Sequence, residues 1–318
     1  MMKNFATLCT VWILSALTLF AEGTERSLLQ DRGFQNGFHV LKPAPGARVV
    51  EKTICFRGPE HAPAWDIAQW SSRFNLATDA SSPASEGGYR LADPAKRVEV
   101  IGRGEGAEAA RLRLAIDSRR EYARPRRSGE PWPHLLVQQS IEDAPTLDQA
   151  ESIRLRLKAR MLQRERFELE GYDPSLHCAQ CPLVLIVQDR NRASEGYGDF
   201  LWFSVPTYDD RWAMPPAHIA EDTADPSAKL IYNPGLAAFT GQGWTDTGLL
   251  ELDIDLLPHM LKAIRTGWAR GYLSKSKDIG DFRIVSFILG WEMPGVNAVE
   301  IEFSELDLRV VERRRVRE

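Results

Sequence analysis

The stretch GDFLWFSVPTYDDRW, residues Gly198–Trp212, holds the pattern that decides the fold. Its first half, Phe200–Val205, is a short apolar run of aromatic and β-branched residues, which predicts a strand buried on both faces. Pro206 has no N–H group to give to a neighbouring strand, so the strand is expected to end there. We therefore expect a protein built from sheets of such strands.

The second half of this stretch packs two aromatic residues, two acids and an arginine into Tyr208–Trp212. Aromatic rings cover the C–H face of a sugar, while carboxylate and guanidinium groups bond its hydroxyls. The sequence therefore predicts a sugar-binding surface with the candidate residues Trp202, Tyr208, Asp209, Arg211 and Trp212. Two alternatives stay open. One is a salt-bridged strand end capped by core aromatics, and the other is a structural calcium site, because Ca²⁺ takes oxygen ligands.

Short apolar or alternating runs recur through the rest of the chain and predict roughly a dozen strands separated by loops. Ser152–Leu162 alternates strictly between apolar and polar residues, which is typical of a strand with one wet face. One helix is expected near residues 256–270, with Asp255 as its N-cap and Pro258 in its first turn. The βαβ rhythm of parallel sheets is missing. We therefore expect an all-β protein, an antiparallel β-sandwich of jelly-roll type with one prominent helix.

The amino terminus has the order of a secretory signal peptide. Lys3 precedes an apolar run, Phe5–Phe20, and the small residue Ala21 stands before a polar segment. We expect a signal peptide over residues 1–21, a single β-sandwich domain over residues 22–318, and a secreted or periplasmic location. Leu19 is larger than the residue usual at its place before a cut, so an uncleaved anchor stays an alternative.

The net charge and the cysteine content limit which partners and cofactors the chain is expected to bind. The 318 residues carry a net charge of −4, and a surface that binds nucleic acid would need a basic excess. Outside the signal, Cys55, Cys178 and Cys181 form an odd set, so at least one thiol is free or pairs between chains. Cys178-Ala-Gln-Cys181 lacks the further ligands of a zinc site, which leaves a loop disulfide or plain thiols. Apart from the possible calcium, no cofactor is expected.

A second cluster lies in the proline-rich loop and strand from Glu121 to Ser140. Glutamines inside an apolar strand are costly to bury unless they meet water or a ligand. We therefore expect a further part of the sugar-binding surface here. Its candidate residues are Arg124, Trp132 and Gln139. A polysaccharide lyase would need a tyrosine or histidine base beside a group that neutralises a uronate carboxylate. Tyr122 and His134 are the catalytic candidates for that role.

A third cluster is Glu251-Leu-Asp253-Ile-Asp255, which a strand would place on one face. It resembles the ExDxE signature of laminarinase-like glycoside hydrolases, which share a jelly-roll scaffold. The resemblance implies Glu251 as nucleophile and Asp253 as its assisting acid. The acid/base glutamate of that signature is here Asp255, which is one methylene shorter and already has a role as helix cap. We predict the cap role for Asp255.

More widely, GDFLWF, YDDRW and LGWEMPG are similar to segments of secreted bacterial jelly-roll proteins that bind or process polysaccharides, such as carbohydrate-binding modules and concanavalin-like sandwiches. The prediction is an exported protein of this kind that recognises a polysaccharide or oligosaccharide. The first alternative is a glycoside hydrolase or polysaccharide lyase on the same scaffold, and the second is a structural envelope protein without a ligand. The tryptophans and charged residues would have to line one surface for either of the first two.

Overall fold

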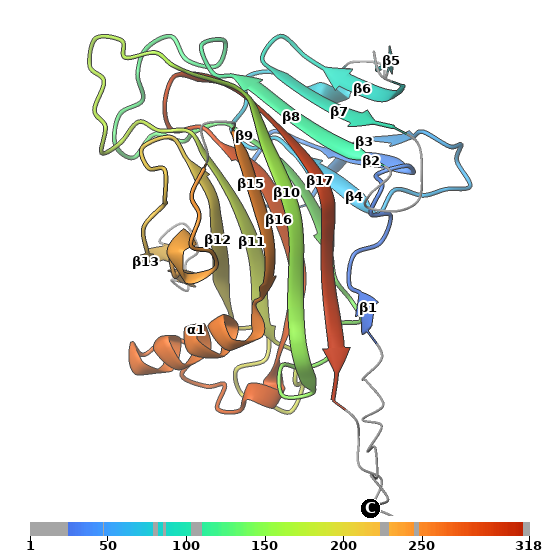
Figure 1. Cartoon of the computed structure of the whole chain (residues 1–318), viewed down its shortest axis with the longest axis vertical. Coiled ribbons are helices and arrows are strands. Elements are labelled where there is room, and N and C mark those ends of the chain that lie inside the picture. Colours follow the sequence, from blue (N-terminus) through green and yellow to red (C-terminus); the bar gives the residue numbers. More distant parts are fainter. Residues whose placement is uncertain are drawn as a thin grey trace, which may run out of the picture.

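Long strands stack as two sheets in the computed structural model of this protein (Figure 1). The structure describes residues 25–46, 48–78, 82–84, 87–102, 110–222, 229–244 and 248–313. The predicted signal peptide lies outside these residues. Among the described helices, none combines the length and the hydropathy that crossing a membrane requires.

The first sheet, here called sheet A, has eight strands. Its path runs through β15 (Leu249–Asp255), β10 (Ala150–Arg166), β17 (Asn297–Glu312), β8 (Arg111–Asp117), β7 (Lys96–Ile101), β6 (Gly88–Ala92) and β5 (Ser82–Pro83), and β1 (Glu25–Ser27) pairs with β17. All pairs in this sheet are antiparallel.

The second sheet, sheet B, has nine strands. They follow the order β13 (His218–Asp222), β14 (Lys229–Asn233), β12 (Phe200–Asp209), β11 (Gln180–Asp189), β16 (Phe282–Glu292), β9 (His134–Ser140), β4 (Trp65–Ala68), β2 (Gly37–Leu41) and β3 (Val50–Cys55). Two pairs, β12 with β14 and β2 with β4, are parallel, and the others are antiparallel.

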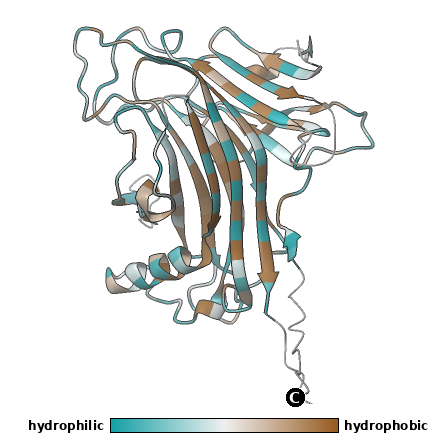
Figure 2. Cartoon of the chain, viewed as in Figure 1, coloured by the Kyte–Doolittle hydropathy of each residue, from teal (hydrophilic) through white to brown (hydrophobic). Residues whose placement is uncertain are grey.

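Alternation along the strands separates the faces of each sheet. In β10, Leu155 and Leu157 are buried in the core while Arg154 and Arg156 are exposed, as the strict alternation of the sequence predicted. Figure 2 shows this as bands of hydrophobic and hydrophilic residues along the long strands. The inward residues of both sheets form one continuous hydrophobic cluster, with members from residue 28 to residue 310. The predicted antiparallel β-sandwich is therefore confirmed.

The predicted helix is also present, as α1 (Leu257–Ala269). Pro258 lies in its first turn, and its buried residues include Leu257, Met260 and Ile264. The helix packs against β10 of sheet A and β12 of sheet B, so it bridges the two layers. Three short 3-10 helices complete the described elements: Leu76–Thr78, Leu236–Ala238 and Ile279–Asp281.

Two details of β12 differ from the prediction. Pro206 does not end the strand, because the pairing of β11 with β12 shifts between Cys181 and Leu183 and places the proline at an irregularity. A proline is tolerated there because the ladder is locally disrupted. In addition, Phe200 and Trp202 are only half-buried, so this strand is fully buried on one face rather than on both.

Candidate functional site

The outward faces of the two sheets differ in chemistry. On sheet A the outward side chains are charged and bonded to one another, for example Arg154 with Asp253, and Arg113 Nε with Glu302 Oε2 at 2.7 Å. Lys158 Nζ likewise lies 2.7 Å from Glu305 Oε1. The charges of this face therefore satisfy each other.

The outward face of sheet B carries apolar and aromatic residues instead. A second hydrophobic cluster lies there, apart from the main core, and several half-buried side chains pack against it. Its buried members are Leu41, Ala68, Leu136 and Ile288, and the half-buried residues against it are Trp70, Val184, Ile186 and Trp202. Hydrophobic residues gathered on an outward face are typical of a surface that binds something.

At one end of this face, four polar residues of neighbouring strands lie side by side. Asp209 of β12 is paired with Gln180 of β11, which is paired with Glu292 of β16, which is paired with His134 of β9. Paired residues of adjacent strands point to the same face. Their neighbours along the chain, such as Cys181, lie in the core, so the four side chains point outward. We call these four residues the transverse row.

The spacing of strands gives the row its length. Neighbouring strands lie about 4.8 Å apart, so the three steps from Asp209 to His134 span about 14 Å between Cα atoms. The row therefore has the reach to contact more than one unit of a linear oligosaccharide.

Asp209 and Gln180 are fixed in place by hydrogen bonds. Gln180 Nε2 donates to Asp209 Oδ2 at 2.7 Å, and the Arg211 guanidinium donates to both carboxylate oxygens at 2.8 and 2.6 Å. Burial opposes the charge on Asp209, but the hydrogen bonds from Arg211 and Gln180 outweigh it and lower the pKa of this carboxyl. Asp209 is therefore an ionised, rigid acceptor.

Glu292 and His134 have no such partners. Among the described residues, the Glu292 side chain forms no hydrogen bond and no ion pair, although it is only half-buried. The Nδ1 atom of His134 is buried and also has no hydrogen-bond partner within the part of the chain that the structure describes. The Glu292 carboxylate in the middle of the row is thus free to bond a ligand, while the buried Nδ1 of His134 would have to be uncovered first.

Tryptophans flank both ends of the row. At the His134 end, Trp132 stacks on the imidazole with ring centroids 5.7 Å apart, and Trp70 meets it edge-on at 5.6 Å. The Nε1 atom of Trp132 is a further buried donor without a partner in the described residues. At the Asp209 end, Trp212 is 52% exposed, and its backbone forms an isolated antiparallel β-bridge with Asp209. Such flanking rings are typical of sugar-binding surfaces.

Of the residues that the sequence predicted as sugar-binding, two lie in the interior. Tyr208 packs in the core against Trp291, with ring centroids 5.7 Å apart, and burial raises its pKa to about 12. The Gln139 amide bonds the backbone N–H and carbonyl of Gln30 at 2.7 and 3.0 Å. Neither side chain reaches the outward face, so both predictions are corrected.

The remaining predicted residues separate into two groups. Asp209, Arg211, Trp212, Trp132 and His134 gather at the transverse row, and Trp202 lies farther along the same face. Arg124 lies apart, because its guanidinium forms two hydrogen bonds with the Glu130 carboxylate, at 3.0 and 2.6 Å.

Tyr122 does not fit the role of a lyase base. Its hydroxyl donates to the Met293 carbonyl at 2.7 Å, and burial raises its pKa well above the ordinary value. A tyrosine that acts as a base near neutral pH needs a pKa lowered toward that pH, and Tyr122 has the opposite shift.

The third cluster lies on the outward face of sheet A. Asp253 is bonded to Arg154, and the Glu251 carboxylate lies 3.9 Å from Lys158 Nζ. Asp255 Oδ1 accepts from the backbone N–H groups of Ile153 and Leu257, both at 3.0 Å, so it contacts the helix start as predicted, but the N-cap residue is Leu256 and not Asp255. These carboxylates are thus engaged in structural contacts, away from the transverse row.

One group of described residues could be considered for a metal ion. A ligand atom from each of Cys178, Asp209 and Asp210 lies within 4.8 Å of the others. However, Asp209 is already bonded to Arg211, and Asp210 Oδ2 accepts from Arg166 at 3.0 Å. Burial also raises the pKa of the Cys178 thiol to about 12, which disfavours the thiolate that a metal needs. These residues therefore do not fit a calcium site, the alternative that the sequence left open.

The site also contains residues that sequence reasoning did not select: Gln180, Glu292 and Trp70. The available signal for Glu292 was a single polar residue that ends an apolar strand just before Pro294-Gly295. Gln180 and Trp70 had no signal of their own. The pairing of β11 with β12 and β16 brings Gln180 to the row, and the pairing of β4 with β9 brings Trp70 beside His134.

Comparison with known proteins gives solved structures only. No protein-family model matches the chain, and no curated protein sequence matches it. An endoglucanase from Rhodothermus marinus superposes with a TM-score of 0.40 at 10% identity, covering 74% of this chain and 96% of its own. A family 11 xylanase from Neocallimastix patriciarum gives a TM-score of 0.37 at 10% identity, covering 73% and 94%. A metagenome-derived glycoside hydrolase family 12 endoglucanase gives 0.40 at 11% identity, covering 78% and 99%. At such scores these likenesses say nothing of what this chain binds or cleaves.

Proposed function

We propose that the outward face of sheet B binds a polysaccharide, with the transverse row at the centre of the contact. The observation that carries this proposal is the row itself. Asp209, Gln180, Glu292 and His134 lie side by side on four neighbouring strands, with tryptophans at both ends. Donors, acceptors and ring faces arranged along a line match the alternating hydroxyl and C–H surfaces of a sugar chain.

The charges near the row favour a neutral glycan. Three carboxylates, those of Asp66, Asp209 and Glu292, lie on the part of this face near the row. Arg48 is bonded to Asp66 and Arg211 to Asp209, and Arg126 lies over the Trp132 ring at 5.0 Å. The acids and arginines therefore balance, so a polyanionic chain would gain little from this face.

Binding is tested with two alanine variants in the row, Trp132→Ala and Gln180→Ala, and a matched variant on the other sheet, Glu251→Ala. The probes are cellulose, xylan and mixed-linkage β-glucan in pull-down and affinity-electrophoresis assays. We expect each row variant to lose about fivefold in affinity for the preferred glycan, because stacking and a hydrogen bond each contribute about 1 kcal/mol. The Glu251→Ala protein should bind like the wild type.

Two results would contradict the proposal. One is equal loss of binding in Glu251→Ala, which would mean that the effect is on folding or on net charge. The other is unchanged binding in both row variants. Circular dichroism of each variant separates a folding defect from a lost contact.

A second candidate function, glycoside hydrolysis, is favoured by the free carboxylate of Glu292. It lies two strands from Asp209, so the Cα atoms are about 9.6 Å apart, and side chains of this length can bring the two carboxyl groups into the range of about 6.5–9.5 Å that inverting glycosidases use. In such a reaction Glu292 would protonate the leaving oxygen, and Asp209, held ionised, would take a proton from the attacking water. Both oxygens of Asp209 already accept hydrogen bonds, which makes it a weaker base. The case for hydrolysis therefore depends mainly on the free carboxylate of Glu292.

Hydrolysis is tested by measuring reducing ends released from the same glycans by the wild type and by Glu292→Gln. Glu251→Gln serves as the matched control. A hydrolase requires release by the wild type, loss of at least about 100-fold in Glu292→Gln, and none in the control. Binding without any release of reducing ends would leave the chain as a binding protein.

We also propose that residues 1–21 direct export, since their order is that of a signal peptide. Mass spectrometry of the protein from its native source tests this. A mature chain that begins near Glu22 supports export, and an intact Met1 on a cytoplasmic species contradicts it.

A further inference from the structure

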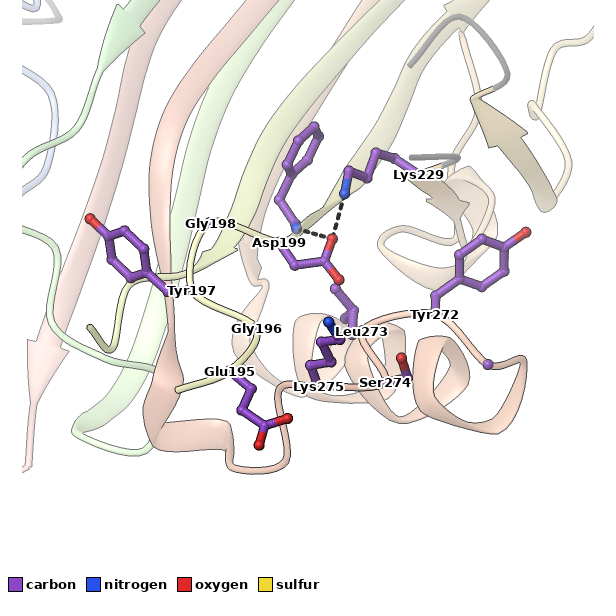
Figure 3. A pocket seen from close by; sticks show the side chains of 12 residues that line it. Glu195, Gly196, Tyr197, Gly198, Asp199, Lys229, Tyr272, Leu273, Ser274 and Lys275 are labelled. Carbon is purple, nitrogen blue, oxygen red and sulfur yellow. Dashed lines mark hydrogen bonds and ion pairs between the residues drawn. The ribbon is translucent and has the colours of Figure 1, made fainter. Parts of the chain in front are cut away.

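A second site, a pocket open to solvent, lies at the far end of β12 from the transverse row. A cavity of about 490 Å³ opens there between the loop of residues 195–199 and the loop of residues 271–275, which follows α1. Phe200 and Lys229, the first residues of β12 and β14, also line it (Figure 3). Phe200 meets Trp202 edge-on, with ring centroids 5.4 Å apart, so the cavity adjoins the aromatic part of the outward face of sheet B.

The two loops are joined by a buried carboxylate. Asp189 is fully buried, and its Oδ2 atom accepts from the hydroxyls of Ser194 and Ser276, each at 2.5 Å. Gly196 permits this contact, because a Cβ atom there would lie 2.0 Å from the Ser276 hydroxyl. The Trp268 indole adds a bond to the Ser276 carbonyl at 2.7 Å. The walls of the cavity are thus held in place without a ligand.

The polar groups of the cavity are only partly used by the protein. Lys229 Nζ donates to Asp199 Oδ1 at 2.5 Å and lies 5.0 Å from the centre of the Phe200 ring. The second oxygen of Asp199 accepts no hydrogen bond from the described residues, and neither does the Lys275 ammonium find a partner among them. In Figure 3 Lys275 rises from the opposite wall toward Asp199. A free acceptor and a free donor therefore face the same space.

These groups suit a neutral ligand with several hydroxyls. Asp199 and Glu195 offset the charges of Lys229 and Lys275, and the end of α1 adds a partial negative charge, so an anion is not favoured. The aromatic face of Phe200 offers an apolar surface within the same cavity. A sugar ring presents both hydroxyls and a C–H face, and a cavity of this volume holds a small ligand.

We propose that this cavity is a second saccharide site that holds a single neutral sugar unit. The proposal deepens the proposed function, since it assigns a second site for the same class of ligand, but it stands on separate residues. Phe200 and Asp209 are the first and last residues of β12, nine steps apart, which is about 30 Å along the strand. A mono- or disaccharide can therefore occupy the cavity without touching the transverse row.

The test uses glucose, xylose, cellobiose and xylobiose as probes, with binding followed by NMR chemical shifts and by calorimetry. With the wild type, we expect shifts of the Gly196, Gly198 and Lys275 amides. Lys275→Met keeps the length of the side chain and removes its donor. We expect it to weaken binding at this site by about tenfold, the effect of losing one charged hydrogen bond. Lys277→Met, an exposed lysine outside the cavity lining, is the matched control and should bind like the wild type.

A second variant keeps the test decisive. Ser274→Trp places a large ring at an exposed position of the lining and should abolish the amide shifts while the fold is kept. The proposal is overturned if no probe shifts the loop amides of the wild type, or if Lys275→Met binds as tightly as Lys277→Met. Trp132→Ala separates the two sites. In that variant the small sugars should still bind in the cavity as in the wild type. In the wild type, binding in the cavity without any polysaccharide binding at the row would leave this inference standing and reject the proposed function.

Discussion

Two carboxylates of the transverse row differ in their hydrogen bonds, and this difference decides what each can do. Asp209 accepts from Gln180, from the Arg211 guanidinium and from the Arg211 backbone N–H. Glu292 accepts from none of the described side chains. A fully bonded carboxylate fixes the geometry of a site, while a free one can exchange a proton with a ligand. We therefore assign protonation of a leaving group to Glu292. Asp209 holds the geometry of the row and, if the chain is a hydrolase, takes the proton of the attacking water.

The pairing of Asp209 also predicts a pH dependence of stability. The folded-state pKa of Asp209 is lowered, so its charge contributes stability above the ordinary aspartate pKa of about 3.9, and this contribution is lost as the pH falls through the lowered value. We expect Asp209→Asn to be less stable than the wild type at neutral pH, and the gap to shrink in acid. Urea unfolding at a series of pH values measures this. A gap that stays constant into strong acid would contradict the assignment.

The thiols differ in reactivity for a similar reason. The structure holds Cys55, Cys178 and Cys181 as free cysteines, and burial raises the pKa of Cys178 to about 12. We expect iodoacetamide at neutral pH to label half-buried Cys55 in the folded protein and to leave Cys178 and Cys181 unlabelled, because only the thiolate reacts. Peptide mass spectrometry identifies the labelled site. Labelling of all three cysteines after unfolding is the control, and fast labelling of Cys178 in the folded state would contradict its burial.

At the scale of elements, Asp255 joins α1 to sheet A. Its Oδ1 atom accepts from Leu257 at the helix start and from Ile153 of β10, both at 3.0 Å. Asp255→Ala should therefore lower the free energy of unfolding by about 0.5–2 kcal/mol and leave glycan affinity unchanged. Asp253→Ala, which removes only exposed ion pairs on the same strand, should cost about 1 kcal/mol or less. Thermal and urea unfolding compare the two. Equal stability of both variants would show that Asp255 does not join the elements.

Local patterns were sufficient to predict most strands and the helix. Strict alternation gave β10, apolar runs gave β11 and most of β12, and helical spacing with Pro258 gave α1. These features depend on neighbours along the chain, which a sequence records directly. Strands β4, β6 and β13 were not predicted, because they are short and carry no clear alternation.

The direction in which single side chains point was harder to predict. Leu135, Leu136 and Val137 are all apolar, so the sequence did not say whether Gln138 or Gln139 faces inward, and the structure buries Gln139. Tyr208 turns into the core because the irregularity at Pro206 changes the alternation of β12. The transverse row depends on the register of four strands far apart in the sequence. That register is set by packing across the sheet.

At the scale of the whole molecule, the two outward faces predict how binding responds to salt. The charges of sheet A are bonded within their own face, and those near the row balance, so a neutral glycan meets little net charge on sheet B. Salt screens charges that are more than about 10 Å apart at 0.1 M, but it leaves stacking and neutral hydrogen bonds nearly unchanged. We expect the affinity for the preferred neutral polysaccharide to stay within about twofold as sodium chloride rises from about 0.05 to 0.5 M.

Affinity electrophoresis over that salt range measures this. Carboxymethylated and unmodified forms of the same polysaccharide are compared, and they differ only in charge. If the face recognises neutral sugars, the unmodified chain binds with little salt dependence and the charged chain gains nothing at low salt. Tighter binding of the charged form that disappears at high salt would instead mean that Arg126, Arg211 or other cations dominate the contact. The glycan would then be acidic. The carboxylates of Asp66, Asp209 and Glu292 would not offset the arginines at the surface that binds it.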